Sequence, residues 1–208
     1  MARVSSPLMS LDASGTYGKA LTFSKWKGRN YVRERVTPSN PKTASQTGVR
    51  AAMKFLAKAW AAFTVANKAT WNAAAATRSI SPFNAYVSTN LARWQENKGP
   101  TEANPAAETL TAPAIASQTL TGGTGSINVA ATVASGTGVW GFAIYRSPSA
   151  ITSTAWNNCV GIIANPGGTS LNFVDSPLVA GTYHYRVAAL TTDGKIGTAC
   201  ADGPAVAS

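Results

Sequence analysis

The sequence predicts a two-part chain: an α+β N-terminal region, with a β-hairpin and two or three helices, followed by an all-β sandwich. Three observations indicate this division. The apolar period changes from helical to strand-like in the second half. Prolines at Pro100, Pro105 and Pro113 mark a boundary between the halves. Residues 1–100 hold 15 of the 18 lysines and arginines, whereas residues 101–208 carry a net charge of −2. We expect an extended arm over residues 1–18, a hairpin-plus-helices docking and oligomerisation domain over 19–98, a linker over 99–112 and a β-sandwich domain over 113–208.

A β-hairpin is predicted just after the arm. Residues 21–26 alternate apolar and polar side chains, as a half-buried strand does, and residues 30–36 continue in the same way. Gly28 lies at the centre of the turn between them. Pro38 and Pro41 end the hairpin. Because two strands alone are marginal in water, we expect this hairpin to need a partner surface.

Helices follow the hairpin. Thr43 and Gln46 have the spacing of a capping box at a helix start. The apolar residues after it are spaced by 4, 3, 4 and 3 and predict one stripe of an amphipathic helix, formed by Val49, Met53, Leu56, Trp60 and Phe63. Thr64 is a candidate cap for a second, shorter helix, and Ser81-Pro82 is a start signal for the last one.

The second half predicts short strands separated by turn signals. Glycine, proline, asparagine and serine clusters divide it at regular intervals. The candidate strands are residues 126–133, 139–147, 160–164, 171–174, 181–190 and 195–201. Six or seven short strands at this spacing are typical of an all-β sandwich.

Two of these strands carry a family resemblance. Residues 139–147, Val-Trp-Gly-Phe-Ala-Ile-Tyr-Arg-Ser, resemble the third strand of fibronectin type III domains, and residues 178–189 resemble the approach to the sixth strand and the strand itself. The resemblance implies a fibronectin type III or immunoglobulin-like sandwich, with Tyr183 or Tyr185 as its corner tyrosine. Trp140 or Trp156 would replace the tryptophan usual in the second strand. The sandwich says little about function, because it hosts many roles.

The first half resembles another group of proteins. Residues 23–33, Phe-Ser-Lys-Trp-Lys-Gly-Arg-Asn-Tyr-Val-Arg, then Asn-Pro-Lys-Thr at 40–43 with Gln46, Trp60 and Trp71, are similar to a region of phage and prophage virion proteins. This resemblance implies a structural protein of a tailed-bacteriophage virion, in a head decoration or fibre, the collar or a tail accessory. It implies capsid, portal or tail proteins as partners, a homo-oligomer, synthesis in the host cytoplasm and localisation in the virion.

The residues expected to dock are basic and aromatic. They are Lys25, Trp26, Lys27, Arg29, Tyr31, Arg33, Arg35, Trp60, Trp71 and Trp94. A hairpin and three helices enclose little volume, so we expect some of the rings to pack between subunits. Alternatives remain open: the cations can solubilise an outer face or contact phosphates with aromatic stacking in nucleic acid, and the tryptophans can form a helix core. A glycan- or host-surface-binding adhesin, using the sandwich loops, is a further alternative.

Chemistry-bearing groups are sparse. His184 is the only histidine, has no acidic residue nearby in sequence, and lies on a strand. The acidic residues are scattered, without the paired spacing of a metal or glycosidase site. We therefore expect no catalytic residue, metal site or cofactor, and a protein that is not an enzyme.

Cys159 and Cys200 lack the spacing of a zinc site. They can form one disulfide or remain buried and reduced. No apolar run approaches the ~20 residues that a bilayer requires, so we expect no membrane partner. The N-terminus lacks the apolar segment of a signal peptide, which predicts that the protein stays in the cytosol or leaves it inside a larger particle.

Overall fold

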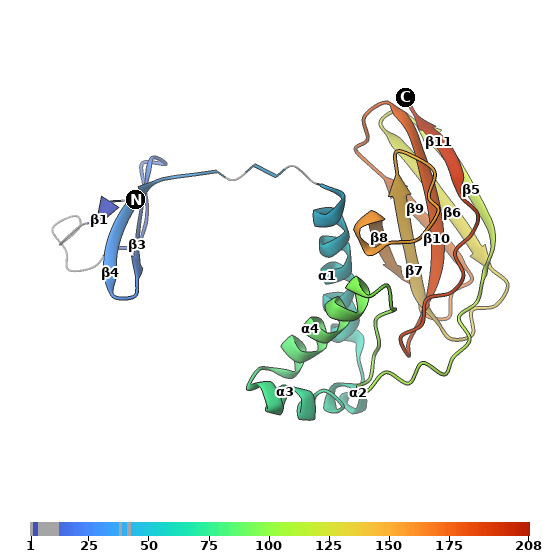
Figure 1. The fold of residues 1–208 in the computed structure, drawn as a ribbon, viewed down its shortest axis with the longest axis horizontal. Coiled ribbons are helices and arrows are strands. Elements are labelled where there is room, and N and C mark those ends of the chain that lie inside the picture. The colour runs from blue at the N-terminus through green and yellow to red at the C-terminus, as the bar shows by residue number, and fades with distance from the viewer. Residues whose placement is uncertain (1, 4–12, 38, 41–42) are drawn as a thin grey trace. The chain divides into compact units, whose positions relative to one another are not determined.

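In the computed structural model, residues 2–3, 13–37, 39–40 and 43–208 are described, and the chain divides into two compact units, Met1–Pro41 and Lys42–Ser208 (Figure 1). This boundary differs from the expected one. It falls before the helices, because the helices share a hydrophobic core with the second-half sheets.

The first unit is a small antiparallel sheet. Its strands are β1 (Ala2–Arg3), β2 (Gly15–Tyr17), β3 (Leu21–Trp26) and β4 (Arg29–Glu34), in the order β1-β4-β3-β2. The predicted hairpin is confirmed as β3 and β4. Its two-residue turn has positive φ at both Lys27 (48°) and Gly28 (76°), the geometry that matches the twist of the strands.

The expected extended arm over residues 1–18 is wrong where the structure describes it. Ala2–Arg3 pairs with β4, and Gly15–Tyr17 pairs with β3. The remaining arm residues, 1 and 4–12, lie outside the described residues, as do Pro38, Pro41 and Lys42.

Four helices open the second unit: α1 (Ala44–Ala62), α2 (Val65–Ala69), α3 (Asn72–Arg78) and α4 (Pro82–Gln95). The predicted starts are confirmed. The hydroxyl oxygens of Thr43, Thr64 and Ser81 each accept a hydrogen bond from the backbone amide three residues later, at 3.4, 3.2 and 3.2 Å.

The buried stripe of α1 differs from the predicted one. The helix buries Gly48, Ala52, Phe55, Leu56 and Ala59, whereas the predicted core residue Met53 is 37% exposed. Small residues bring the helix close to its neighbours, since a Cβ atom on Gly48 would lie 2.9 Å from the carbonyl oxygen of Trp156. Of the predicted stripe, Leu56 and Phe63 are buried and Val49 and Trp60 are half-buried, so the stripe is correct in part and wrong at Met53.

Two antiparallel sheets complete the second unit. One has the order β11-β10-β7-β8 and the other β5-β6-β9. Their strands are β5 (Ile115–Gly123), β6 (Ser126–Val133), β7 (Val139–Ser147), β8 (Cys159–Ala164), β9 (Ser170–Asp175), β10 (Gly181–Thr191) and β11 (Gly203–Ala207), with a 3₁₀ turn, η2 (Trp156–Asn158), before β8. The fold is thus mixed α+β and rich in sheet.

Five of the six predicted strands are confirmed within two residues at either end. The sixth, residues 195–201, is not a regular strand, although the amide of Gly197 donates to the carbonyl oxygen of Ala189 (2.8 Å) and that of Cys200 to the carbonyl oxygen of Val187 (3.0 Å). The last strand is β11 instead. Strand β5 was not predicted, because its Ser, Gln, Thr and Gly residues show no clear apolar alternation.

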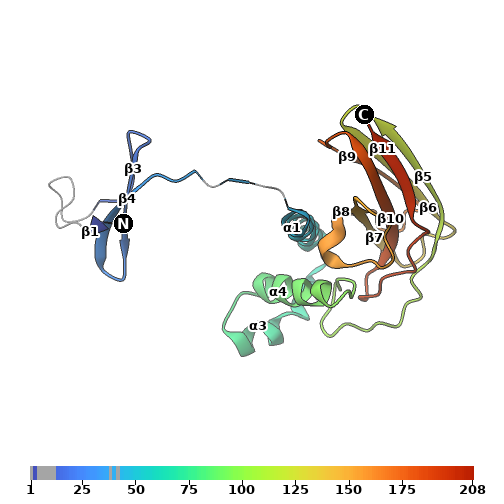
Figure 2. The same cartoon turned by 45° about the horizontal axis from the view of Figure 1, so that its top comes forward.

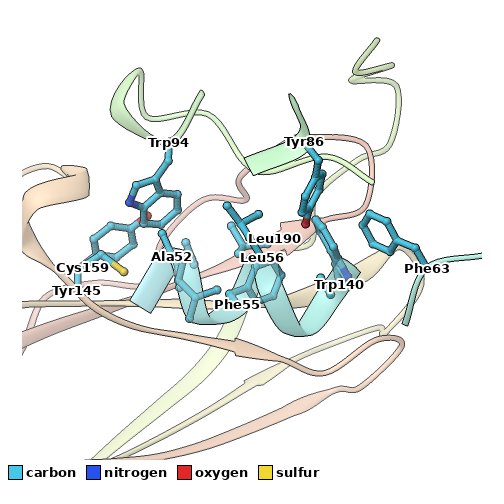
Figure 3. Packing of buried hydrophobic residues seen from close by; sticks show 14 of the residues in the cluster. Ala52, Phe55, Leu56, Phe63, Tyr86, Trp94, Trp140, Tyr145, Cys159 and Leu190 are labelled. Carbon is cyan, nitrogen blue, oxygen red and sulfur yellow. The ribbon is translucent and has the colours of Figure 1, made fainter. Parts of the chain in front are cut away.

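Two hydrophobic cores lie on opposite faces of the sheet β11-β10-β7-β8. The inter-sheet core, between the two sheets, includes Ile127, Val129, Phe142, Ile144, Leu171, Tyr185 and Val187. The helix-side core, between that sheet and the helices, includes Phe55, Leu56, Tyr86, Trp94, Trp140, Tyr145 and Leu190 (Figure 3). Central strands β7 and β10 are consequently buried on both faces.

The expected linker over residues 99–112 is not a free spacer. Arg93 Nε donates to the carbonyl oxygen of Gly99 (3.0 Å), and the amide of Thr101 donates to Asn90 Oδ1 (2.7 Å). The amide of Leu110 donates to Asp193 Oδ2 (2.6 Å). These bonds fasten the segment to α4 at one end and to the turn after β10 at the other.

Candidate docking site

The register of the N-terminal sheet gathers a basic and aromatic set on one face. Trp26 pairs with Arg29, Ser24 with Tyr31, and Thr22 with Arg33. Directly paired residues of an antiparallel sheet share a face, and residues two apart along a strand do too. Trp26, Arg29, Tyr31 and Arg33 therefore form one surface, here called the basic face.

The other predicted docking residues of the hairpin lie elsewhere. Lys25 pairs with Asn30 and so lies on the opposite face, which also carries Phe23 and Val32. Lys27 lies in the turn, with its Nζ atom 4.9 Å from the centroid of the Trp26 ring, a cation–π contact. Arg35 follows β4, and its amide donates to the carbonyl oxygen of Ala20 at 2.7 Å. The sheet thus divides a cluster that is continuous in sequence.

The basic face is open to solvent. Trp26 is 66% exposed, Arg29 and Arg33 are exposed, and Tyr31 is half-buried. Among residues 13–37 and 39–40, no side chain is buried. A sheet normally buries one face against a second layer, and exposed tryptophan, tyrosine and arginine are the residue types that anchor interfaces. The arrangement suits contact with an anionic partner surface.

Two of the three helix tryptophans are buried in a core, which is one of the two environments that the sequence left open. Trp71 is fully buried and donates from Nε1 to the carbonyl oxygen of Glu102 at 2.9 Å. Trp94 is 3% exposed and stacks on Tyr145, with ring centroids 6.4 Å apart. Trp60 is half-buried, and its ring centroid lies 5.2 Å from that of Tyr86. The prediction that Trp71 and Trp94 dock onto a partner is wrong, because the chain's own sheet and helices cover these rings.

Trp140 belongs to the same helix-side core. Its ring lies 4.8 Å from Phe55 and 6.0 Å from Phe63 between centroids (Figure 3). It therefore does not fill the inter-sheet core, as the resemblance implied, and it is not available to a ligand at the sandwich loops. Trp156 lies in η2 and is half-buried against the same core.

The possible disulfide between Cys159 and Cys200 is not formed, since both thiols are free. Cys159 belongs to the helix-side core, whereas Cys200 packs against the inter-sheet core, where its sulfur accepts from the Val187 amide at 3.1 Å. Burial raises the pKa of the Cys159 thiol to about 12, against a smaller lowering by hydrogen bonds to the backbone of Gly161 and Ile144.

The structure adds a pair that sequence reasoning missed. His184 Nδ1 and Asp202 Oδ2 lie 2.6 Å apart, and Asp202 Oδ1 accepts from the Ile151 amide at 3.2 Å. The pairing of β10 with β11, which sets His184 opposite Pro204, brings Asp202 alongside. Only a correct placement of the last strand could have revealed this pair. The pair joins β10, the segment before β11 and the loop that holds Ile151.

Among the described residues, no three His, Cys, Asp or Glu side chains gather as a metal ion would require. No helix formed by these residues combines the length and apolar character needed to cross a membrane.

Comparison with known proteins finds a structural neighbour but no family. No protein-family profile and no curated protein matches the sequence. Among solved structures, the chain is similar to a β-1,2-glucanase from Parabacteroides distasonis, with a TM-score of 0.37 and 19% identity. The match covers 48% of this chain and 13% of the glucanase.

The prediction that the chain is not an enzyme is contradicted by this match, because the matched protein is an enzyme. That prediction is withdrawn. A TM-score this low supports no argument about the activity of the present chain, and the glucanase's reaction is not transferred to it.

Proposed function

We propose that the chain is a structural component of a tailed-bacteriophage virion, in a head decoration or fibre, the collar or a tail accessory. The basic face of the N-terminal sheet docks onto other virion proteins of the capsid, portal or tail. The Lys42–Ser208 unit is displayed from the particle. The protein assembles as a homo-oligomer and functions in the virion.

The observation that carries docking is the exposure of the basic face. Trp26, Arg29 and Arg33 are exposed on one face of a sheet in which the described residues bury no side chain. Neither arginine forms an ion pair with a carboxylate among the described residues. Burying the rings would stabilise a complex, and the arginines would fix its register and accelerate encounter. The virion assignment itself comes from the sequence resemblance of residues 23–33 and their surroundings.

For the displayed unit, we propose a fibronectin type III-like sandwich. Its strands divide into β5-β6-β9 and β11-β10-β7-β8, so the first, second and fifth strands of the sandwich form one sheet. The hydroxyl of Tyr183 donates to the carbonyl oxygen of Val179, four residues upstream, at 3.0 Å. This bond has the form of a tyrosine corner and supports the assignment.

Incorporation into particles tests the virion proposal. A phage deleted for this gene would be complemented with the natural chain, with Arg33→Glu, or with Lys19→Glu as a control. Lys19 is an exposed cation of the same unit, in the β2–β3 turn. We expect purified particles to contain the natural and control chains and to lose most of the Arg33→Glu chain. If particles never contain the natural chain, the proposal is wrong.

Nucleic-acid binding is a second candidate, favoured by the alternation of rings and arginines on the basic face. Aromatic side chains can stack on bases while arginines contact phosphates. Titration of the natural chain against single-stranded DNA at two salt concentrations discriminates the candidates. Binding that weakens steeply as the salt concentration rises, and that Trp26→Ala abolishes, would favour nucleic acid.

A further inference from the structure

A groove runs between α1 and the edge strand β8 of the second unit. Its first part has a volume of about 390 Å³ and is lined by α1, by β8 and by Phe173 of β9. A second hollow, of about 410 Å³, continues it toward Trp140 and Pro166. The two parts share Lys58 and Ala164, so they form one elongated site. α1 lies beside β8 in both Figure 1 and Figure 2.

The groove follows the open edge of a sheet. β8 pairs only with β7 among the described strands, and it ends the order β11-β10-β7-β8. Five consecutive residues, 160–164, line the groove. Because alternate side chains of a strand point to opposite faces, a groove lined by every residue must lie along the strand's edge. The backbone of β8 is thus available to pair with another strand.

The helix and the strand are matched in direction and length. Gly48 of α1 faces the carbonyl oxygens of Trp156 and Cys159, at the start of β8. Lys58 of α1 and Ala164 of β8 both line the groove at the opposite end of the strand. α1 therefore runs alongside β8 in the same direction. The helix rises about 15 Å from Gly48 to Lys58, and the strand about 17 Å from Cys159 to Ala164.

The helix wall of the groove is positively charged. Arg50, Lys54 and Lys58 line it, and all three are exposed. No carboxylate lines this part of the groove, and no described carboxylate forms an ion pair with these cations. The opposite wall, with Ile163 and Phe173, is apolar.

The spacing of the cations selects the shape of the ligand. Successive cations are four positions apart on the helix, a rise of about 6 Å. Alternate side chains of an extended strand repeat at about 6.6 Å. A strand lying on β8 can therefore place an acidic side chain opposite each cation and turn the intervening side chains toward Phe173.

From this geometry we propose that the α1–β8 groove binds an extended segment of a partner protein, in which acidic residues alternate with apolar ones. The segment adds to β8 as a further strand, so that backbone hydrogen bonds supply affinity. Its carboxylates pair with Arg50, Lys54 and Lys58, and its apolar side chains cover the wall at Phe173. This site is separate from the basic face and does not depend on the proposed virion role.

Peptide binding to the full chain tests the proposal. A fluorescent peptide, Asp-Val-Glu-Val-Asp-Val-Glu, would be titrated by anisotropy beside a peptide of the same composition with its acidic residues grouped together. We expect the alternating peptide to bind more tightly. The Lys54→Gln/Lys58→Gln variant should bind it roughly five- to tenfold more weakly, because two exposed ion pairs are lost. Lys19→Gln/Lys98→Gln removes two exposed lysines outside the groove and should leave the affinity unchanged.

Strand addition is tested by peptides that leave the protein unaltered. The alternating peptide would be prepared in two N-methylated forms. One form would carry methyl groups on the backbone amides of its odd-numbered residues, and the other on those of its even-numbered residues. Because only one set can face β8 in an antiparallel or parallel ladder, we expect one methylated peptide to lose binding and the other to retain it. Equal binding of grouped and alternating peptides, equal binding of both methylated peptides, or no binding would overturn the proposal. Stronger groove-dependent binding of single-stranded DNA would overturn it in favour of nucleic acid.

Discussion

At the scale of single residues, Asp193 links residues 99–112, which follow α4, to the end of strand β10. Its carboxylate accepts from the Leu110 amide and from the Thr191 hydroxyl, each at 2.6 Å. Burial alone would raise the pKa of Asp193, but these hydrogen bonds and others from the backbone of Thr109 and Lys195 hold it below its ordinary value. The charged carboxylate therefore stabilises the folded state.

The first prediction concerns this carboxylate. Asp193→Asn should lower the free energy of unfolding by about 1 kcal/mol at neutral pH, because charged hydrogen bonds are replaced by weaker ones. The folded-state pKa is depressed, so the contribution of Asp193 is present above the unfolded-state value of about 3.9 and is lost as pH falls through the folded-state value. Urea unfolding at pH 7 and pH 3 should show the difference shrinking in acid. Glu96→Gln, at an exposed carboxylate, is the control.

A second prediction at this scale concerns the thiols. The thiolate is the reactive form, and burial raises the pKa of Cys159 to about 12 and raises that of Cys200 as well. With an aromatic disulfide reagent at pH 8, Cys200, which is half-buried, should react slowly, and Cys159 only after unfolding. Peptide mapping would identify the order. Rapid labelling of Cys159 in the native protein would show that the helices do not stay on the sheet.

At the scale of elements, the contact of α1 with β8 depends on a glycine. In an exposed helix interior, Gly→Ala normally stabilises by about 1 kcal/mol. At Gly48 the new Cβ would lie 2.9 Å from the carbonyl oxygen of Trp156 and 3.0 Å from that of Cys159, and backbone atoms cannot move aside cheaply. We predict that Gly48→Ala destabilises the protein by about 1–3 kcal/mol, as overpacking does. Ala57→Gly, on the exposed side of α1, is the reciprocal control. Stabilisation by Gly48→Ala, measured by thermal unfolding, would contradict the contact.

The elements that could be predicted from sequence are those set by local chemistry. The caps at Thr43, Thr64 and Ser81 act within one turn, and the hairpin turn needs only Lys27-Gly28 and alternating neighbours. The contact face of α1 could be predicted only in part, at Leu56, because a close approach also favours small residues such as Gly48 and Ala52. β11 follows a segment that pairs irregularly with β10, so its position depends on tertiary contacts.

At the scale of the whole molecule, the candidate sites differ in how far sequence could define them. The basic face could be predicted as a cluster, but the pairing register was needed to assign Lys25 to the opposite face. The sequence left Trp71 and Trp94 open between a helix core and a partner surface, and the choice depended on a sheet that is covered on both faces. The sequence of β7 indicated burial on both faces only indirectly. Residues 139–145 are all buried, so the strand lacks the polar–apolar alternation of a half-exposed strand. The α1–β8 groove combines segments more than 100 residues apart and leaves no local pattern.

The two-faced sheet leads to a prediction about cooperativity. The helices cover Trp140, Tyr145 and Leu190, all 3% exposed or less, so the two sheets of the second unit should not be stable without them. A chain of residues 42–208 should melt within about 2 °C of the full chain, a difference below ~1 kcal/mol. Residues 99–208 alone should melt far lower or aggregate, because a large apolar face is then exposed.

A point substitution separates this loss of packing from the effects of truncation. Within residues 42–208, Phe55→Ala removes the ring that packs on Trp140 at 4.8 Å and should cost about 3–5 kcal/mol. Met53→Ala, on the same helix but 37% exposed, should cost much less. Circular dichroism and tryptophan fluorescence should follow one transition for helices and sheets in the unaltered protein. Two separate transitions, or sheets that melt unchanged without the helices, would mean that the helix-side core does not join helices and sheets into a single folding unit.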